Sequence, residues 1–161
     1  MIEIITGDLL DATEKYILHQ TNCISNSGAA GVAKAIFDKY PYADCYLSRT
    51  EVSKPGTIDI RGNGEDQRFV INLHGQYYPG GCRYPESSLD GVRVRQKYFY
   101  RGLLRVAKLE GLESIALPWR VGCGIAGGDW EYYLGTLTNF ANYVEEQQGA
   151  RVVIYRREGD E

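Results

Sequence analysis

Apolar and polar positions follow two different periods along the chain, and these separate expected strands from expected helices. Short segments that are apolar nearly throughout, or that alternate with a period of two, are typical of β-strands. The pair Asn63-Gly64, typical of a tight turn, lies between two such segments and predicts a hairpin. The expected strands span residues 1–6, 16–21, 57–61, 67–74, 115–117 and 152–155.

Three other segments place their apolar residues three and four positions apart, so that one face of a helix would be buried. Pro41 ends the first of these helices and Gly149 follows the last. The expected helices span residues 29–40, 89–110 and 130–144, with short helical turns at 9–12 and 41–50. We therefore expect a three-layer α/β/α fold: a mixed, mainly parallel sheet of about six strands with helices on both faces, in a single domain over residues 1–161.

The composition is that of a soluble globular protein, since 43% of the 161 residues are apolar and 24% are charged. The net charge of -3 argues against a general nucleic-acid-binding protein. We find no basic and apolar leader and no apolar run of membrane-spanning length. The four cysteines are far apart without a C-x-x-C pair, which favours free thiols in a reducing compartment. We expect a cytoplasmic monomer with no membrane association, no metal and no cofactor.

Two glycine-rich loops each join an expected strand to an expected helix: residues 22–31, and residues 120–128 before a helix that begins near Asp129. Glycines let the backbone approach a ligand closely, and free N–H groups at a helix start favour anions. Such loops follow the carboxyl ends of parallel strands, where ligands bind, so together they could hold a diphosphate; flexible connections are the alternative. Neither loop has the G-x-x-x-x-G-K-[ST] motif, and no G-x-G-x-x-G follows the first strand, which argues against a kinase, NTPase or dehydrogenase.

Five short motifs resemble, in their order and spacing, those of the macrodomains, a family of ADP-ribose-binding modules. They are G-D-L-L at Gly7 to Leu10, L-H-Q-T-N-C at Leu18 to Cys23, G-A-A-G-V-A-K-A-I at Gly28 to Ile36, V-I-N-L-H at Val70 to His74, and P-W-R-V-G-C-G-I-A-G-G-D-W at Pro118 to Trp130. The resemblance covers nearly the whole chain. The H-x-x-N form and the last motif are most similar to the branch that processes ADP-ribose 1''-phosphate.

The resemblance implies that the protein binds ADP-ribose or a derivative and hydrolyses one, with dephosphorylation of ADP-ribose 1''-phosphate as the first expectation. The alternatives are an ADP-ribosyl hydrolase acting on modified protein or nucleic acid, and a non-catalytic reader of ADP-ribose. ADP-ribosylated macromolecules would then be partners. The branch that frees ADP-ribose from glutamate uses a lysine after the fourth strand and an aspartate in the second loop. Gly75-Gln76 and Ala126 stand in these places, which argues against the lysine-dependent mechanism.

The resemblance also assigns ligand-binding residues. Asp8 matches the aspartate that accepts from the adenine amino group, and Tyr155 would lie against the adenine; an N-cap and a core tyrosine are the alternatives. Asn22 matches the asparagine that binds the distal ribose hydroxyls, and an amide can both donate and accept. The expected ligand-binding residues are Asp8, Leu9, Asn22, Gly28, Gly31, Val32, Gly122, Cys123, Gly124, Ile125, Ala126, Gly127 and Tyr155.

His19 and Asp129 resemble the pair proposed for catalysis in the phosphatase-like branch. A histidine exchanges protons near neutral pH. An aspartate at a helix start tends to stay ionised, which favours a base or an orienting role. The alternatives are a hydrogen-bonded core histidine and a plain helix N-cap. His74, at the end of another expected strand, is a second candidate, for which a structural role is favoured.

Overall fold

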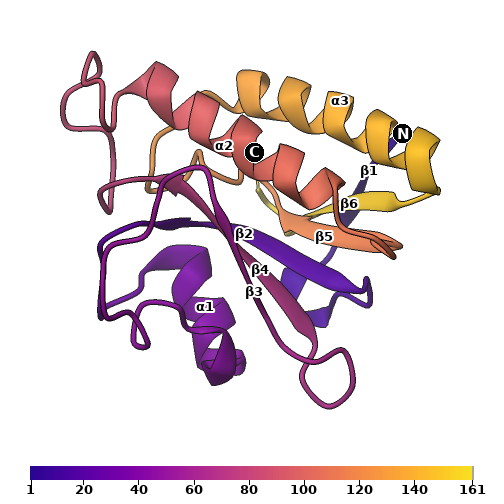
Figure 1. Cartoon of the computed structure of the whole chain (residues 1–161). Helices are drawn as coiled ribbons and strands as arrows, with labels where there is room; N and C mark the ends of the chain where they lie inside the picture. Colours follow the sequence, from indigo (N-terminus) through magenta and orange to yellow (C-terminus); the bar gives the residue numbers. More distant parts are fainter. Residues whose placement is uncertain (161) are drawn as a thin grey trace.

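A single six-stranded sheet forms the centre of the protein in the computed structural model, which describes residues 1–160 (Figure 1). The strand order across the sheet is β1-β6-β5-β2-β4-β3. Neighbouring strands are parallel except β3 and β4, which form an antiparallel pair at one edge. The strands are β1 (Ile2–Thr6), β2 (Tyr16–Asn22), β3 (Ile58–Arg61), β4 (Phe69–Gln76), β5 (Ser114–Pro118) and β6 (Arg151–Arg156).

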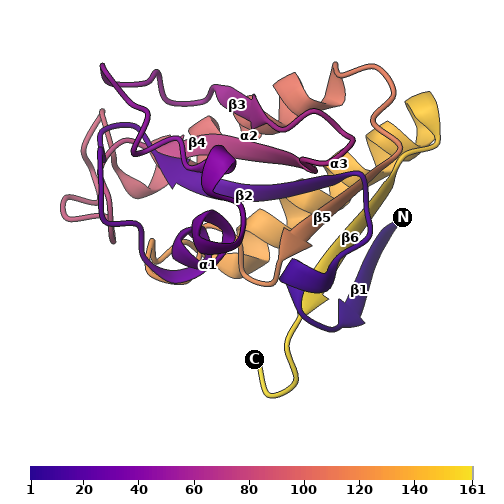
Figure 2. The same cartoon turned by 90° about the horizontal axis from the view of Figure 1, so that it is seen from below.

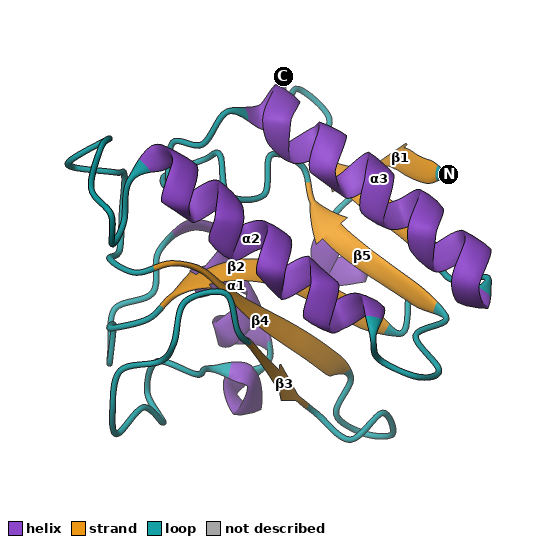
Figure 3. Ribbon diagram, turned by 45° about the horizontal axis from the view of Figure 1, so that its top comes forward, coloured by secondary structure: helices purple, strands orange, loops and turns teal. Residues whose placement is uncertain are grey.

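Helices cover both faces of this sheet. One face carries α1 (Gly31–Lys39), while α2 (Val92–Ala107) and α3 (Trp130–Gln148) lie side by side across the other (Figures 2 and 3). Two short 3₁₀ helices, Leu9–Asp11 and Pro41–Ala43, lie in the connections. The expected three-layer α/β/α fold with a mainly parallel sheet is therefore confirmed.

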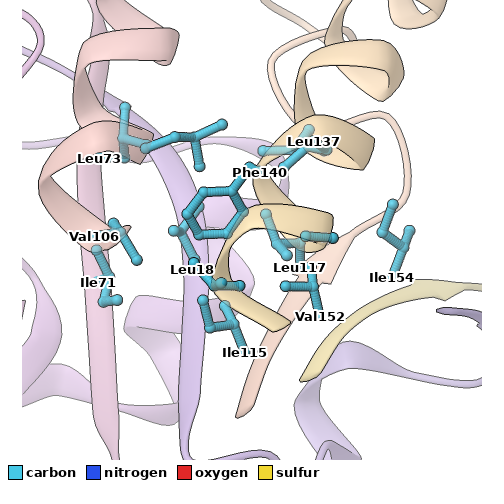
Figure 4. Close-up of a cluster of buried hydrophobic side chains, with 14 of the residues drawn as sticks. Leu18, Ile71, Leu73, Val106, Ile115, Leu117, Leu137, Phe140, Val152 and Ile154 are labelled. Carbon is cyan, nitrogen blue, oxygen red and sulfur yellow. The ribbon is translucent and has the colours of Figure 1, made fainter. Parts of the chain in front are cut away.

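The side chains of the central strands alternate between two hydrophobic clusters, one on each face. Because successive residues of a strand point to opposite faces, Ile17 joins the cluster under α1, and Leu18 joins the cluster under α2 and α3. This double burial explains why these strands are apolar nearly throughout. Figure 4 shows the cluster under α2 and α3, with Leu18, Ile71, Leu73, Val106, Ile115, Leu117, Leu137, Phe140, Val152 and Ile154 labelled.

Helix α2 packs closely against β4 at Gly102, which has no side chain. A Cβ atom at this position would lie 2.4 Å from Leu73 Cγ. The close approach holds the start of α2 beside the carboxyl end of β4, where the loop of residues 77–91 connects the two elements. The end of α2 that begins after this loop is therefore fixed relative to the sheet.

The expected elements are found with shifted ends. The predicted helix at 89–110 begins at Val92 instead, since Gly91 and Ser87 form a turn in which the Gly91 N–H donates to the Ser87 carbonyl at 2.9 Å. The segment 41–50 forms a 3₁₀ helix only over Pro41–Ala43 and continues as turns. Within residues 1–160 no helix is long and apolar enough to cross a membrane.

Candidate functional site

Two adjoining cavities lie at the carboxyl ends of the strands, each of about 400 Å³. We call residues 23–30, between β2 and α1, the first loop, and residues 119–129, between β5 and α3, the second loop. The first cavity lies between these loops, and the second cavity lies beside the ends of β1 and β6. Both cavities are lined by Gly31, Val32, Pro118, Trp119 and Asp160, so they share one wall.

The two loops approach each other closely because β2 and β5 are neighbours in the sheet, and the second loop lies next to α1 in Figure 2. Gly31, the first residue of α1, has φ of 60°. A Cβ atom there would lie 3.0 Å from Ile125 Cδ1. A side chain at this position would therefore be strained and would also narrow the gap between the loops.

The first loop is held by the side chain of Asn22. Asn22 Oδ1 accepts from the N–H groups of Ile24 and Ser25, at 3.1 and 2.8 Å, and Nδ2 donates to Tyr46 Oη at 3.1 Å. The Arg49 guanidinium donates to the carbonyls of Ser25 and Asn22, at 2.8 and 2.9 Å. The amide oxygen of Asn22 is thus engaged within the loop, and the group that this side chain can offer to a ligand is its remaining N–H.

The second loop is tied to the loop of residues 77–91 by Arg95, whose side chain is 4% exposed. Arg95 pairs with Asp90 at 2.6 Å and donates to the carbonyls of Gly80 and Ala126, at 2.9 and 3.3 Å. Asp90 in turn accepts from the Tyr77 N–H at 2.7 Å. One buried ion pair therefore fixes two walls of the first cavity. Burying a charge is costly unless it is paired, as it is here.

His19 lines the first cavity and is 1% exposed. Asn72 Nδ2 donates to the Ala43 carbonyl and to Asp59 Oδ2, at 2.9 and 3.0 Å, so Asn72 Oδ1 faces the imidazole. The 2.6 Å contact from His19 Nε2 to this oxygen makes Nε2 the protonated nitrogen. Nδ1 is then a hydrogen-bond acceptor, and it has no partner within the described part of the chain.

Burial lowers the pKa of His19 from 6.5 to about 4. The cause is loss of solvation of the charged form, which the hydrogen bond to Asn72 offsets only in part. Burial also lowers the pKa of His74 to about 4, and its Nδ1 lies 2.7 Å from Thr21 Oγ1. His19 is therefore neutral at physiological pH and can accept a proton or a hydrogen bond at Nδ1, but it holds no proton there to give away.

Two glutamines form another part of the wall of the first cavity. Gln20 Nε2 donates to Gln76 Oε1 at 2.8 Å, and Gln76 Nε2 donates to the carbonyls of Tyr78 and Gly80, at 2.8 and 3.1 Å. Gln20 Oε1 is buried and finds no donor among residues 1–160. Gln76 stands where a lysine is expected in the branch that frees ADP-ribose from glutamate. A network of neutral amides therefore occupies this part of the wall.

The second cavity is lined by Asp8 and Tyr155, in addition to Trp119 and Asp160, which it shares with the first cavity. Asp8 Oδ1 accepts from the Leu10 N–H at 2.9 Å, which makes Asp8 the N-cap of the first 3₁₀ helix. Tyr155 Oη donates to Glu14 Oε1 at 2.5 Å, and burial together with this contact raises the pKa of Tyr155 to about 12. The hydroxyl of Tyr155 is therefore occupied, and the ring is the part that borders the cavity.

Comparisons with solved structures identify this arrangement. The macrodomain of Mycobacterium tuberculosis DarG matches with a TM-score of 0.69 and 23% identity, over 96% of this chain and 97% of that one. A variant of the Oceanobacillus iheyensis macrodomain with ADPR matches with a TM-score of 0.65 and 21% identity, over 96% of this chain and 83% of that one. The chain has the macrodomain fold.

Sequence comparison also finds a relative of this chain. The chain is 28% identical over 152 residues to an uncharacterized 17.5 kDa protein from the tk-vs intergenic region of Enterobacteria phage T4, covering 90% of this chain and 93% of that protein. No protein-family model matches the chain. Within residues 1–160 no group of three or more His, Cys, Asp or Glu side chains is arranged to hold a metal ion.

The macrodomain fold brings most of the expected ligand-binding residues to the two cavities. The first cavity is lined by His19, Asn22, Gly28, Gly31, Val32, Gly122, Gly124, Ile125 and Ala126, and the second by Asp8, Leu9, Gly31, Val32 and Tyr155. Cys123 is buried behind the second loop, and burial raises the pKa of its thiol to about 12. Cys123 and Gly127 do not line either cavity.

Asp129 lies at the start of α3 and is exposed. Its Oδ1 accepts from the Glu131 N–H at 3.1 Å, as an N-cap does, and the residue lines neither cavity. The structure thus does not bring Asp129 to the cavity that His19 lines. A catalytic role for the pair stays a prediction, and the cap is the role that the observed hydrogen bond supports.

Sequence reasoning did not find several residues that line the cavities. The main additions in the first cavity are Gln20, Ser25, Tyr46, Gln76, Pro79, Gly80, Trp119 and Arg120. The additions in the second are Leu10, Ala35, Ile36 and Arg157, together with Pro118, Trp119 and Asp160, which line both cavities. Arg95, which holds the walls, had a signal in the sequence: an arginine four positions before Phe99 on the buried face of a helix needs a buried partner.

Proposed function

We propose that this cleft binds ADP-ribose and that the protein dephosphorylates ADP-ribose 1''-phosphate. The observation that carries the proposal is the pair of adjoining cavities: Asp8 and Tyr155 line only the second, while amide, hydroxyl and imidazole groups line the first. The shared wall of glycine, valine and loop backbone lies between them. An elongated ligand with a base at one end, a diphosphate in the middle and a ribose at the other end fits this division. The Oceanobacillus iheyensis macrodomain with ADPR, which has the same fold, supports it.

In this proposal the adenine occupies the second cavity. Within residues 1–160 only one carboxylate oxygen of Asp8 accepts a hydrogen bond, so the other can accept from the adenine amino group. The ring of Tyr155, whose hydroxyl is held by Glu14, offers a stacking surface. Leu9, 8% exposed, adds apolar contact at the same end of the cleft.

The diphosphate lies between the two loops. The first turn of α1 has free N–H groups, because Ala30 at its N-cap forms no side-chain hydrogen bond with them. A helix start of this kind favours anions. The backbone of the second loop faces it across the gap beside Gly31 and Ile125. The distal ribose would then lie beside Asn22 in the first cavity.

The reaction proceeds at the C1'' end of the ligand, beside His19. A water molecule adds to phosphorus as the bond between phosphorus and the C1'' oxygen breaks. In this proposal the water reaches His19 Nδ1, which is buried, unprotonated and without a partner among residues 1–160, and gives it a proton. The leaving oxygen takes a proton from solvent, and inorganic phosphate is released. Because burial lowers its pKa to about 4, His19 is unprotonated at neutral pH and is a weaker base than a free imidazole.

The test is a substrate panel in which phosphate and ADP-ribose release are both measured. The wild type is expected to release phosphate from ADP-ribose 1''-phosphate, and His19→Gln is expected to bind ADP-ribose but to lose that activity. Release of ADP-ribose from a modified glutamate peptide or oligonucleotide, with no phosphatase activity, would replace the proposal by an ADP-ribosyl hydrolase. Binding without any turnover would leave a reader of ADP-ribosylated macromolecules. Absence of ADP-ribose binding in a calorimetric titration would overturn all three.

A further inference from the structure

Tyr46 lies beside Asn22 at the wall of the first cavity, with a ring that is covered by other side chains. The ring of Phe37 meets it edge to face, with centroids 5.4 Å apart, and the Arg49 guanidinium carbon lies 5.3 Å from its centroid. Tyr46 is 5% exposed and lines the first cavity. Since neighbours cover the ring, the hydroxyl end is the part of the side chain that borders the cavity.

Both lone pairs of this hydroxyl are occupied. Tyr46 Oη accepts from the backbone N–H of Asn22 at 3.0 Å and from Asn22 Nδ2 at 3.1 Å. A phenol hydroxyl can accept two hydrogen bonds and donate one. Because Tyr46 Oη already accepts two, it can only donate to a further partner. Burial raises the pKa of Tyr46 to about 12, so the proton is present at neutral pH. Within residues 1–160 no hydrogen bond uses this proton.

We propose that Tyr46 is a ligand-binding residue whose O–H donates to an oxygen at the C1'' end of the bound ligand. The inference rests on the proposed function and adds a contact to it. Tyr46 borders the first cavity together with His19, Asn22 and Ser25, and it does not line the second cavity. Its donor therefore serves the distal ribose or the group attached to that ribose, and not the adenosine.

The Tyr46 hydroxyl lies near other hydrogen-bonding groups that line the first cavity. Asn22 has one amide N–H left to donate, because its oxygen and its other N–H are engaged within the chain. His19 lines the same cavity, and its Nδ1 is a buried acceptor without a partner among residues 1–160. Two neutral donors suit an oxygen-rich ligand end such as a sugar or a phosphate ester, which they would bind in a cavity that Arg120 also lines.

The first experiment compares ADP-ribose with ADP, which lacks the distal ribose, by calorimetric titration of the wild type and Tyr46→Phe. Loss of one neutral hydrogen bond is expected to weaken ADP-ribose binding by about fivefold, while ADP binding is unchanged. Equal affinity of both proteins for ADP-ribose, or equal weakening for ADP, would overturn the assignment. Wild-type protein that binds no ADP-ribose would instead overturn the proposed function.

The second experiment separates donation from support of Asn22, because Tyr46→Phe also removes the acceptor for two N–H groups. Fluorinated tyrosine incorporated at position 46 has a more acidic hydroxyl, which donates more strongly and accepts more weakly. Unchanged or tighter ADP-ribose binding at pH 6.5 is expected if the hydroxyl donates to the ligand. Weaker binding of ADP-ribose to the fluorinated protein would mean that the hydroxyl only positions Asn22, and would refute direct contact.

Discussion

The two histidines of this protein are buried and neutral, and acid should therefore destabilise it early. Only His19 and His74 are present, and burial lowers the pKa of each from 6.5 to about 4. Between about pH 4 and pH 6.5 the histidines bind protons in the unfolded chain but not in the folded chain. The stabilisation is thus complete above pH 6.5 and is lost as the pH falls towards 4. At pH 5 each histidine should reduce the free energy of unfolding by about 2 kcal/mol relative to pH 8.

The assay is urea unfolding at pH 8 and pH 5 for the wild type, His19→Gln and His74→Gln. Each variant serves as its own reference, because the difference between the two pH values cancels the cost of the substitution itself. Between pH 8 and pH 5 the two histidines should lower the free energy of unfolding of the wild type by about 4 kcal/mol. The decrease should be about 2 kcal/mol smaller in each variant, which keeps one histidine. NMR gives an independent check, since a protein with two histidines has two imidazole Cε1–H signals. Signals that titrate near pH 6.5, or an unchanged pH dependence in both variants, would refute the reasoning.

Three further predictions concern the loops. Asp129→Ala should lower the free energy of unfolding by about 1 kcal/mol because the helix loses its cap, whereas Asp129→Asn should keep the wild-type value. Phosphatase activity that survives in Asp129→Asn would exclude a catalytic role for the carboxylate. Gly31→Val should weaken ADP-ribose binding at least about tenfold in calorimetry, because φ of 60° and the nearby Ile125 leave no room. Arg95→Met should cost about 3 kcal/mol in urea unfolding, since it leaves Asp90 buried without its partner.

A matched control exists for the glycine substitution. Gly135 lies in the interior of α3, is exposed, and a Cβ atom there would meet nothing within 4 Å. Gly135→Ala should raise the free energy of unfolding by about 0.5–1 kcal/mol and leave ADP-ribose binding unchanged. For Arg95, the double variant Arg95→Met with Asp90→Asn should recover part of the loss if the uncompensated charge is its cause. Equal losses in single and double variants would point to packing instead.

The elements of the fold could be predicted because their causes are local. Strands buried on both faces are apolar throughout, helices with one buried face repeat every three to four residues, and Asn63-Gly64 marks the hairpin between β3 and β4. The two loops could be predicted as a pair because neighbouring parallel strands end at one edge. Their contact through Gly31 and Ile125 agrees with that reasoning.

The walls of the cleft could not be predicted because their contacts join distant positions. Tyr46 lies 24 residues from Asn22, and Arg95 reaches across 31 residues to Ala126. No periodicity encodes such pairs, since each depends on how α2 and the turns after α1 pack on the sheet. Asp129 shows the opposite difficulty: one short motif is consistent with both a cap and a catalytic group, and only its hydrogen bond and exposure distinguish them.

The division of the interior into two clusters has a mechanical consequence for the cleft. The first loop leads into α1, which is anchored in one cluster, and the second loop leads into α3, which is anchored in the other. A ligand that binds both loops would link α1 to α3, so that local unfolding of one helix would be coupled to local unfolding of the other. Hydrogen exchange would then slow on both faces of the sheet together. At a ligand concentration of a hundred times Kd, the gain in the free energy of unfolding would reach about 2.7 kcal/mol.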